Sequence, residues 1–261
     1  MNDLQLARAT THRVARTFGL ATRLLPRDVR DDVYRLYLVF RTLDDLVDDG
    51  HPDAGARVAA VETWARGGPA VGPEATTLAA LGAPPGALLS FCAGMRADLD
   101  PLGHETEADL DRYCHQVAGT VGLTMAELLG ARGDAAMRAA DALGKAMQRT
   151  NVLRDIDEDR RNGRVYLARE TIERCGGSLE PGARALLMRD QIARADALYD
   201  EGVAGIQLLP RGRRAIAAAA GMYREILRQI ERDGLGARPG RAVVSTRRKL
   251  AVALRATVAR A

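Results

Sequence analysis

The 261-residue chain is poor in aromatic side chains, which make up 4% of it and include one tryptophan and three phenylalanines. Its core must therefore be built mainly from leucine, alanine, valine and isoleucine. The basic residues are spread along the sequence without aromatic neighbours on which bases could stack, so nucleic-acid binding is not expected. The three cysteines, Cys92, Cys114 and Cys175, form no CxxC pair, which indicates neither a disulfide framework nor a zinc site.

Long apolar runs are absent as well. No segment reaches the ~20 consecutive apolar residues that a membrane-spanning helix needs, and the N-terminus lacks the apolar stretch of a secretory signal. We therefore expect a cytoplasmic protein, with peripheral binding at the inner face of a membrane left open. The formal net charge of +4 and the pI of about 9.2 suit an anionic small molecule or an anionic membrane surface.

Helical pattern, in contrast, fills the sequence. Hydrophobic residues form 47% of the chain and recur at three- and four-residue spacing, while the alternation typical of strands is almost absent. Pro- and Gly-rich segments interrupt this pattern, but none is long enough to link two domains, and no internal repeat occurs. We expect one all-α domain over residues 1–261, folded as a helical bundle. The predicted helices span 3–24, 27–49, 54–65, 85–99, 106–130, 134–160, 181–207, 211–232 and 241–259.

The stretch "RTLDDLVDD" ends one of these helices with four aspartates. Asp44 and Asp48 are four residues apart, as are Asp45 and Asp49, so each pair shares a helix face, and Arg41 lies one turn earlier. Like charges at this spacing cost roughly 0.2–0.5 kcal/mol per pair, and acids are unfavourable at a helix C-terminus. A divalent cation such as Mg²⁺ would reverse that penalty. The alternative is a solvated acidic helix end, which is the expectation for Asp49.

A second acidic stripe lies in "NVLRDIDED". Asn151, Asp155 and Asp159 follow one another at four-residue spacing between apolar neighbours, and Gln148 lies one turn earlier. Asp157 flanks the stripe and is interpreted as solvated. Two such helices in one bundle predict a cavity in which Mg²⁺ and a diphosphate are held from both sides. Nearby arginines suit the diphosphate oxygens: Arg154, Arg160, Arg161 and Arg164.

Both motifs, with the "GRVYL" that follows the second, resemble those of the squalene/phytoene synthase family, the head-to-head prenyl synthases. "RTFGLATRLLP", "GMRADLD", "YCHQVAGTVG" and "LLPRGRRAIAAAAGMYREIL" resemble further blocks of that family in the same order, so the resemblance spans nearly the whole chain. Ala168 stands where the family usually has proline, and Thr17 stands where serine commonly precedes phenylalanine. The loops around 66–85 and 174–183 look short for the family. These departures concern substrate and lid geometry and leave the metal-binding motifs intact.

The resemblance implies an isoprenoid-synthase type of bundle with a central cavity and the activity of a prenyltransferase. The implied reaction is the Mg²⁺-dependent 1–1′ condensation of two prenyl diphosphates through a cyclopropylcarbinyl diphosphate, with release of diphosphate. Geranylgeranyl diphosphate (C20) would give phytoene, and farnesyl diphosphate (C15) would give dehydrosqualene or squalene. Mn²⁺ could replace Mg²⁺, and NADPH is implied only for squalene. The alternatives are an enzyme that stops at presqualene diphosphate or cyclises its substrate, and a non-catalytic assembly protein. The chain is expected to act as a monomer or a homodimer.

Site residues follow from the motifs and the matching blocks. The expected metal ligands are Asp44, Asp48, Asn151, Asp155 and Asp159. The expected catalytic residues are the four aspartates of that set with Tyr37 and Tyr223. The expected substrate-binding residues are Arg41, Asp45, Gln148, Arg154, Phe18, Thr22, Tyr113, Gly119, Tyr166 and Arg241.

For several of these residues a structural role stays open. Each tyrosine could belong to the core, Gly119 could serve close helix packing, and the arginines could form ordinary helix salt bridges. If Phe18 and Thr22 line a hydrophobic tunnel together with Tyr34, the small Thr22 leaves room for a C20 chain. His104 is expected at the surface.

Overall fold

The computed structural model describes residues 5, 8, 16–99 and 103–258, and every regular element in these ranges is helical, as predicted. The α-helices are α2 (Arg16–Ala21), α3 (Arg27–Asp48), α4 (Ala54–Ala65), α5 (Pro73–Ala80), α6 (Pro85–Leu99), α7 (Glu107–Cys114), α8 (Thr120–Leu128), α9 (Asp134–Arg161), α10 (Arg169–Arg174), α11 (Ala185–Ala204), α12 (Arg213–Arg232) and α13 (Thr246–Val258). Three short helices complete the set: η1 (Thr22–Leu24), η2 (His115–Gly119) and η3 (Gly205–Leu208).

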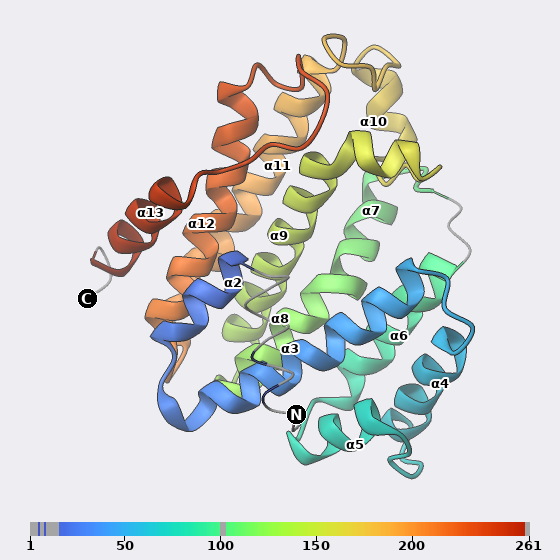
Figure 1. The fold of residues 1–261 in the computed structure, drawn as a ribbon, viewed down its shortest axis with the longest axis vertical. Helices are drawn as coiled ribbons and strands as arrows, with labels where there is room; N and C mark the ends of the chain where they lie inside the picture. Colours follow the sequence, from blue (N-terminus) through green and yellow to red (C-terminus); the bar gives the residue numbers. More distant parts are fainter. Residues whose placement is uncertain (1–4, 6–7, 9–15, 100–102, 259–261) are drawn as a thin grey trace.

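Helix α9 runs through the centre of the bundle and packs against α8, α11 and α12 (Figure 1). Helix α3 crosses in front of it in that view, and α4, α5 and α6 lie together on the right. Helix α13 packs along the outer side of α12, at the left. The two helices that carry the acidic motifs are thus the central helix and one that crosses it.

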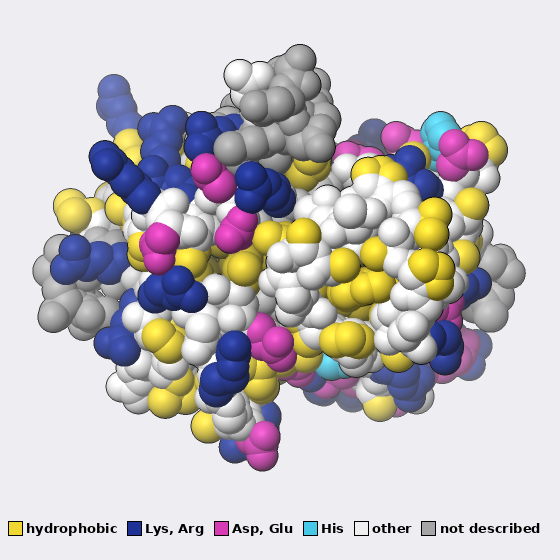
Figure 2. All heavy atoms as spheres, turned by 90° about the horizontal axis from the view of Figure 1, so that it is seen from below, with side chains coloured by type: hydrophobic (Ala, Val, Ile, Leu, Met, Phe, Trp, Pro, Cys, Tyr) yellow, Lys and Arg dark blue, Asp and Glu magenta, His cyan; other side chains and the backbone are white. Residues whose placement is uncertain are grey.

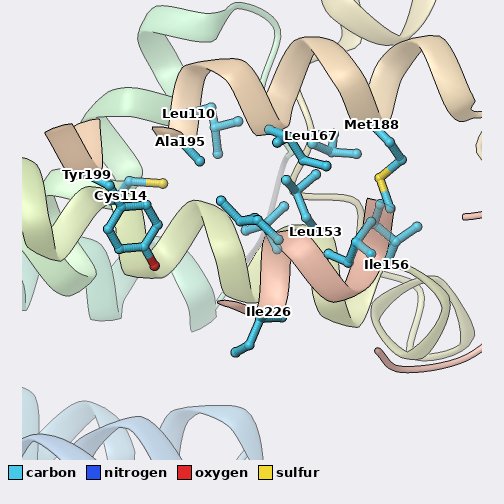
Figure 3. Packing of buried hydrophobic residues seen from close by; sticks show 14 of the residues in the cluster. Leu110, Cys114, Leu153, Ile156, Leu167, Met188, Ala195, Tyr199 and Ile226 are labelled. Atoms are coloured by element: carbon cyan, nitrogen blue, oxygen red, sulfur yellow. The ribbon is translucent and has the colours of Figure 1, made fainter. Parts of the chain in front are cut away.

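Two large clusters of buried side chains hold the bundle together. The first lies between α7, α9, α11 and α12 and includes Leu153, Met188 and Ile226 (Figure 3). The second packs α3 against α4 and α6, where the rings of Phe40 and Phe91 meet edge to face with centroids 4.7 Å apart. Burying one such side chain contributes about 1.5–3 kcal/mol. Outside the few aromatics the core is aliphatic, as the composition predicted.

Two helices were not predicted, and two others begin four or five residues later than predicted. Helix α5, with Pro73 in its first turn and Gly82 two residues after its end, and the six-residue α10 were not predicted, because both are shorter than the window over which helical periodicity can be recognised. Helix α11 begins at Ala185 rather than 181. Helix α13 begins at Thr246 rather than 241, since Gly240 has a φ of +97° and the residues after it are not helical.

The predicted helix 106–130 is interrupted by η2, a π-helical turn. Two glycines of this segment, Gly119 in η2 and Gly122 in α8, lie against α9. A Cβ atom at Gly119 would collide with the carboxylate of Asp141, and one at Gly122 would collide with the backbone carbonyl of Ala140. Close packing of the two helices therefore accounts for glycine at both positions. A π turn of this kind is frequent beside functional sites, and this one places α7 and α8 against the central helix.

Candidate active site

The first acidic cluster lies in the last turns of α3. Arg41 donates from Nη1 to Asp44 Oδ2 at 2.9 Å and also pairs with Asp45. Burial, together with the charge of Asp48, raises the pKa of Asp44 to about 6, and Arg41 opposes this rise only in part. Asp49 is exposed at the helix end, as predicted. The cluster thus holds more negative charge than its own arginine neutralises.

The second cluster lies near the C-terminal end of α9. Arg154 contacts its neighbour Asp155 through two bonds, from Nε to Oδ1 at 2.8 Å and from Nη2 to Oδ2 at 2.6 Å. Arg241, from the segment between α12 and α13, adds a contact from Nε to Asp155 Oδ1 at 2.9 Å. One turn further along, burial and the charges of Asp155 and Glu158 raise the pKa of Asp159 to about 7.

Arg164 joins the two clusters. It follows α9, and its Nη1 donates to Asp48 Oδ1 at 2.6 Å across 116 residues of sequence. The charges of Arg164 and Asp48 both act on the pKa of Asp159, and that of Arg164 also acts on the pKa of Asp44. The two acidic helices therefore face each other across one polar space, as the sequence predicted.

The donor set of this space fits Mg²⁺, which prefers carboxylate and amide oxygens. Asn151 donates from Nδ2 to Gln148 Oε1 at 3.2 Å, and its Oδ1 is buried with no hydrogen-bond partner among the described residues. A buried oxygen without a partner is costly, and a cation would satisfy it. Within the described ranges no three acidic, histidine or cysteine side chains converge on one point, and arginines pair with Asp44, Asp48 and Asp155.

An apolar cavity of about 250 Å³ adjoins the acidic space, between α8, α9, α11 and α12. On α9 its lining runs from Ala136 to Met147 and ends directly before Gln148, where the polar residues begin. Tyr223 of α12 lines it as well. Tyr37 of α3 lies close enough to Tyr223 for the two to affect each other's charge, and burial raises the pKa of Tyr37 to about 12. The arrangement suits an apolar chain with an anionic head.

A second hollow, of about 480 Å³, lies on another side of the acidic space, and Arg164 forms part of its wall. Tyr113 donates from its hydroxyl to Asp98 Oδ2 at 3.1 Å and stacks on Tyr166 with ring centroids 5.3 Å apart. Burial raises the pKa of Asp98 to about 7 although Tyr113 opposes this. His104 packs on Tyr113 at 4.9 Å and is half-buried, so the prediction of a surface position was wrong. Sequence reasoning also missed Asp98, whose signal was an acid near the end of a mostly apolar helix.

The chain as a whole matches the model of the squalene/phytoene synthase family over residues 11–248. The chain belongs to the squalene/phytoene synthase family. Phytoene synthase from Thermus thermophilus is 41% identical over 232 residues, which cover 84% of this chain and 80% of that protein. The 15-cis-phytoene synthase from Synechococcus elongatus is 33% identical over 286 aligned positions, which cover 96% of this chain and 92% of that protein.

Solved structures of the family have the same fold. A dehydrosqualene synthase in complex with ligand superimposes with a TM-score of 0.88 at 28% identity, over 98% of this chain and 96% of that one. Squalene synthase HpnC from Alicyclobacillus acidocaldarius superimposes with a TM-score of 0.78 at 28% identity, over 90% of this chain and 95% of that one. The predicted isoprenoid-synthase type of helical fold is confirmed.

In this squalene/phytoene synthase family member, Asp157 is not the solvated side chain that the sequence predicted. Arg184, which is 2% exposed, contacts its carboxylate from Nη1 at 2.6 Å and from Nη2 at 2.8 Å, and the N–H of Gly240 donates to Oδ2 at 2.7 Å. The bonds from Arg184 lower the pKa of Asp157. Asp157 therefore fastens α9 to the segment that also brings Arg241 to Asp155.

Two of the four arginines assigned to the diphosphate point elsewhere. Arg160 pairs with Glu180, and Arg161 is exposed and donates from Nε to the backbone carbonyl of Asp157. Arg154 and Arg164 remain beside the acidic space.

The residues expected to limit the length of the prenyl chain belong to the first described helices of the protein. Phe18 belongs to α2, but its side chain lies outside the described part of the protein. Thr22 is buried in η1, with its hydroxyl 3.0 Å from the carbonyl of Gly19 and 3.2 Å from the hydroxyl of Tyr34. Thr22 and Tyr34 therefore lie together, as expected, although other residues line the apolar cavity. Their influence on chain length stays a prediction.

Proposed function

We propose that the protein condenses two molecules of geranylgeranyl diphosphate to phytoene by 1–1′ coupling, through a cyclopropylcarbinyl diphosphate, and releases two diphosphates and two protons. The observation that carries this proposal is the pair of carboxylate stripes on α3 and α9, which face each other beside an apolar cavity. Similarity to phytoene synthases supports the C20 substrate. Farnesyl diphosphate, with dehydrosqualene or squalene as product, is the alternative.

Mg²⁺, with Mn²⁺ as a substitute, is the proposed cofactor. When bound, the ion neutralises the diphosphate and makes it a better leaving group. Its proposed ligands are Asp44, Asp48, Asn151, Asp155 and Asp159. Their donor types and the buried Oδ1 of Asn151, which has no hydrogen-bond partner among the described residues, support this choice.

The arginines of the site are proposed to bind the diphosphate oxygens. Arg41, Arg154 and Arg164 pair with the aspartates, at the edge of the space where the anion would lie. Once a cation satisfies the carboxylates, the guanidinium groups can form charge-assisted bonds to phosphate instead, and their planar shape allows two parallel bonds each. The arginines then hold the leaving group away from the apolar end of the site.

The apolar cavity is proposed to hold the prenyl chain and to exclude water, which would quench a carbocation. Its lining is mostly alanine, glycine, leucine and methionine, whose side chains neither donate protons nor act as strong nucleophiles. Tyr37 and Tyr223 lie where the cavity meets the acidic space. There their ring faces can stabilise developing positive charge.

The test is to incubate the purified protein with Mg²⁺ and either geranylgeranyl or farnesyl diphosphate, with and without NADPH. We expect geranylgeranyl diphosphate to give phytoene and two diphosphates per product, independently of NADPH. Farnesyl diphosphate turned over in preference, or NADPH oxidised during turnover, would exclude the phytoene assignment. If no diphosphate is released from either substrate, the proposed enzymatic activity is excluded.

No helix in the described ranges is both long and apolar enough to cross a bilayer. We propose a cytoplasmic protein that binds the inner face of a membrane peripherally, because its product and the tails of its substrates are apolar. It is proposed to act as a monomer or a homodimer, which sedimentation velocity distinguishes.

A further inference from the structure

Helix α13 turns its large apolar side chains away from the protein. Leu250 and Leu254, four residues apart, are 52% and 66% exposed. The opposite face, which packs on α12 and its neighbours, carries the smaller Val252, Ala253 and Ala256. A helix on the surface of a soluble protein normally shows the reverse order, with its large apolar residues inward. The outer face of α13 is therefore an apolar stripe that the described residues leave uncovered.

Positive charge surrounds this stripe. Arg247, one turn before Leu250, and Arg255, next to Leu254, are exposed, and no ion pair joins either of them to another described residue. After Asp233 the chain has no acidic residue and seven basic ones, which are Arg238, Arg241, Arg247, Arg248, Lys249, Arg255 and Arg260. Figure 2 shows Lys and Arg side chains gathered on the left, the side on which α13 lies in Figure 1, with hydrophobic side chains among them.

The stripe lies over the wall of the apolar cavity. Helix α12 packs on α13 with one side, and through Ile216, Ala219 and Tyr223 it lines the cavity. A single helix therefore separates the cavity from the surface that carries the stripe. An apolar ligand of the cavity would be bound within one helix diameter of whatever covers α13.

We propose that the outer face of α13, defined as Arg247, Leu250, Leu254 and Arg255, docks the protein on an anionic lipid surface. The two leucines enter the boundary between headgroups and acyl chains, and the two arginines contact lipid phosphates. A second copy of the chain is a poorer occupant, because a symmetric contact would bring the same arginines of both copies together. The docking rests on the proposed function only in that an apolar product gives it a use.

Co-sedimentation of the full chain with vesicles tests the proposal without reference to activity. We expect binding to vesicles of phosphatidylglycerol and phosphatidylcholine, little binding to phosphatidylcholine alone, and release at high salt. The Arg247→Gln/Arg255→Gln double variant should bind about 25-fold more weakly, since each basic residue near an anionic surface contributes about fivefold. The Leu250→Ser/Leu254→Ser double variant should bind these vesicles at least about tenfold more weakly.

Matched controls come from α11. Leu186 is 58% exposed and Arg189 is also exposed, so Leu186→Ser and Arg189→Gln should bind as the wild type does. Equal binding to neutral and anionic vesicles, or undiminished binding by both double variants with unchanged thermal melting, would overturn the proposal. A shift in oligomeric state of the leucine variant without a loss of vesicle binding would assign the stripe to a second copy instead. A protein that binds vesicles but forms no product would refute the proposed function and leave the docking face intact.

Discussion

At the scale of single residues, two carboxyl groups of the acidic space have raised pKa values, which make the stability of the protein depend on pH. Burial, followed by the charges of Asp155 and Glu158, raises the pKa of Asp159 to about 7, and burial followed by Asp48 raises that of Asp44 to about 6. In the unfolded chain both groups titrate near pH 4. Between about pH 4 and about pH 7 the folded protein therefore binds more protons than the unfolded one, so its free energy of unfolding falls as the pH rises.

The Asp159→Asn substitution should consequently stabilise the metal-free protein, and more so at higher pH. The amide mimics the protonated carboxyl, which the folded state prefers. We expect a gain of about 1–2 kcal/mol at pH 8, after allowing for the partial exposure of the group, and almost none at pH 4. Urea unfolding at both pH values in the presence of EDTA measures it. A gain that is equal at the two values would show that the proton is not its cause.

Asp48 and Asp49 are adjacent aspartates with different expected roles. Both are exposed, but Asp48 contacts Arg164 and faces the second acidic helix, whereas Asp49 lies beyond the last turn of α3. We expect Asp48→Asn to lower the rate of diphosphate release by on the order of 100-fold or more. Asp49→Asn serves as the control with the same charge change and should stay within about twofold. Equal losses in the two variants would point to the net charge of the cluster rather than to a ligand.

At the scale of elements, spacing within one helix was predictable and contacts between helices were not. The i, i+4 pattern placed Asp44 with Asp48 and Asp155 with Asp159 on shared faces, because helix geometry alone fixes those faces. The bond between Arg184 and Asp157 depends on how the chain folds back after α9, and no local pattern encodes it. The same holds for the exposed leucines of α13, since the sequence shows an amphipathic helix but not which face its neighbours cover. Short helices such as α5 were not predicted because eight residues are too few to show helical periodicity.

Glycines within helices give a test at this scale. A Cβ atom at Gly144, in the middle of α9, would collide with the backbone carbonyl of Ala118, whereas one at Gly55, in α4, would meet nothing within 4 Å. Helix propensity alone favours alanine at both sites by up to about 1 kcal/mol. We expect Gly55→Ala to stabilise the protein by about 0.5–1 kcal/mol and Gly144→Ala to destabilise it by about 1–3 kcal/mol. Thermal unfolding of the two variants compares them, and stabilisation by both would mean that η2 and α9 can move apart.

The side chains of the candidate active site come from α3, from α9 with the residues directly after it, and from the segment before α13. Arg164, just after α9, contacts Asp48 of α3, and Arg241, in the segment before α13, contacts Asp155 of α9. No one helix holds all of the proposed metal ligands. A ligand that spans the acidic space therefore reports on the assembled bundle, and its binding energy should add to the stability of the fold.

Mg²⁺ together with an unreactive thiolodiphosphate analogue of the substrate should thus raise the melting temperature more than either does alone. At 100 times Kd the gain is about 2.7 kcal/mol, which for a chain of this size corresponds to roughly 5–10 °C. The shift should be smaller at pH 6 than at pH 8, because protons on Asp44 and Asp159 compete with the ion. Arg164→Gln should reduce the shift, whereas Arg160→Gln, at an arginine that pairs with Glu180 instead, should leave it unchanged. A full shift with the analogue in EDTA would mean that the arginines hold the diphosphate without a metal.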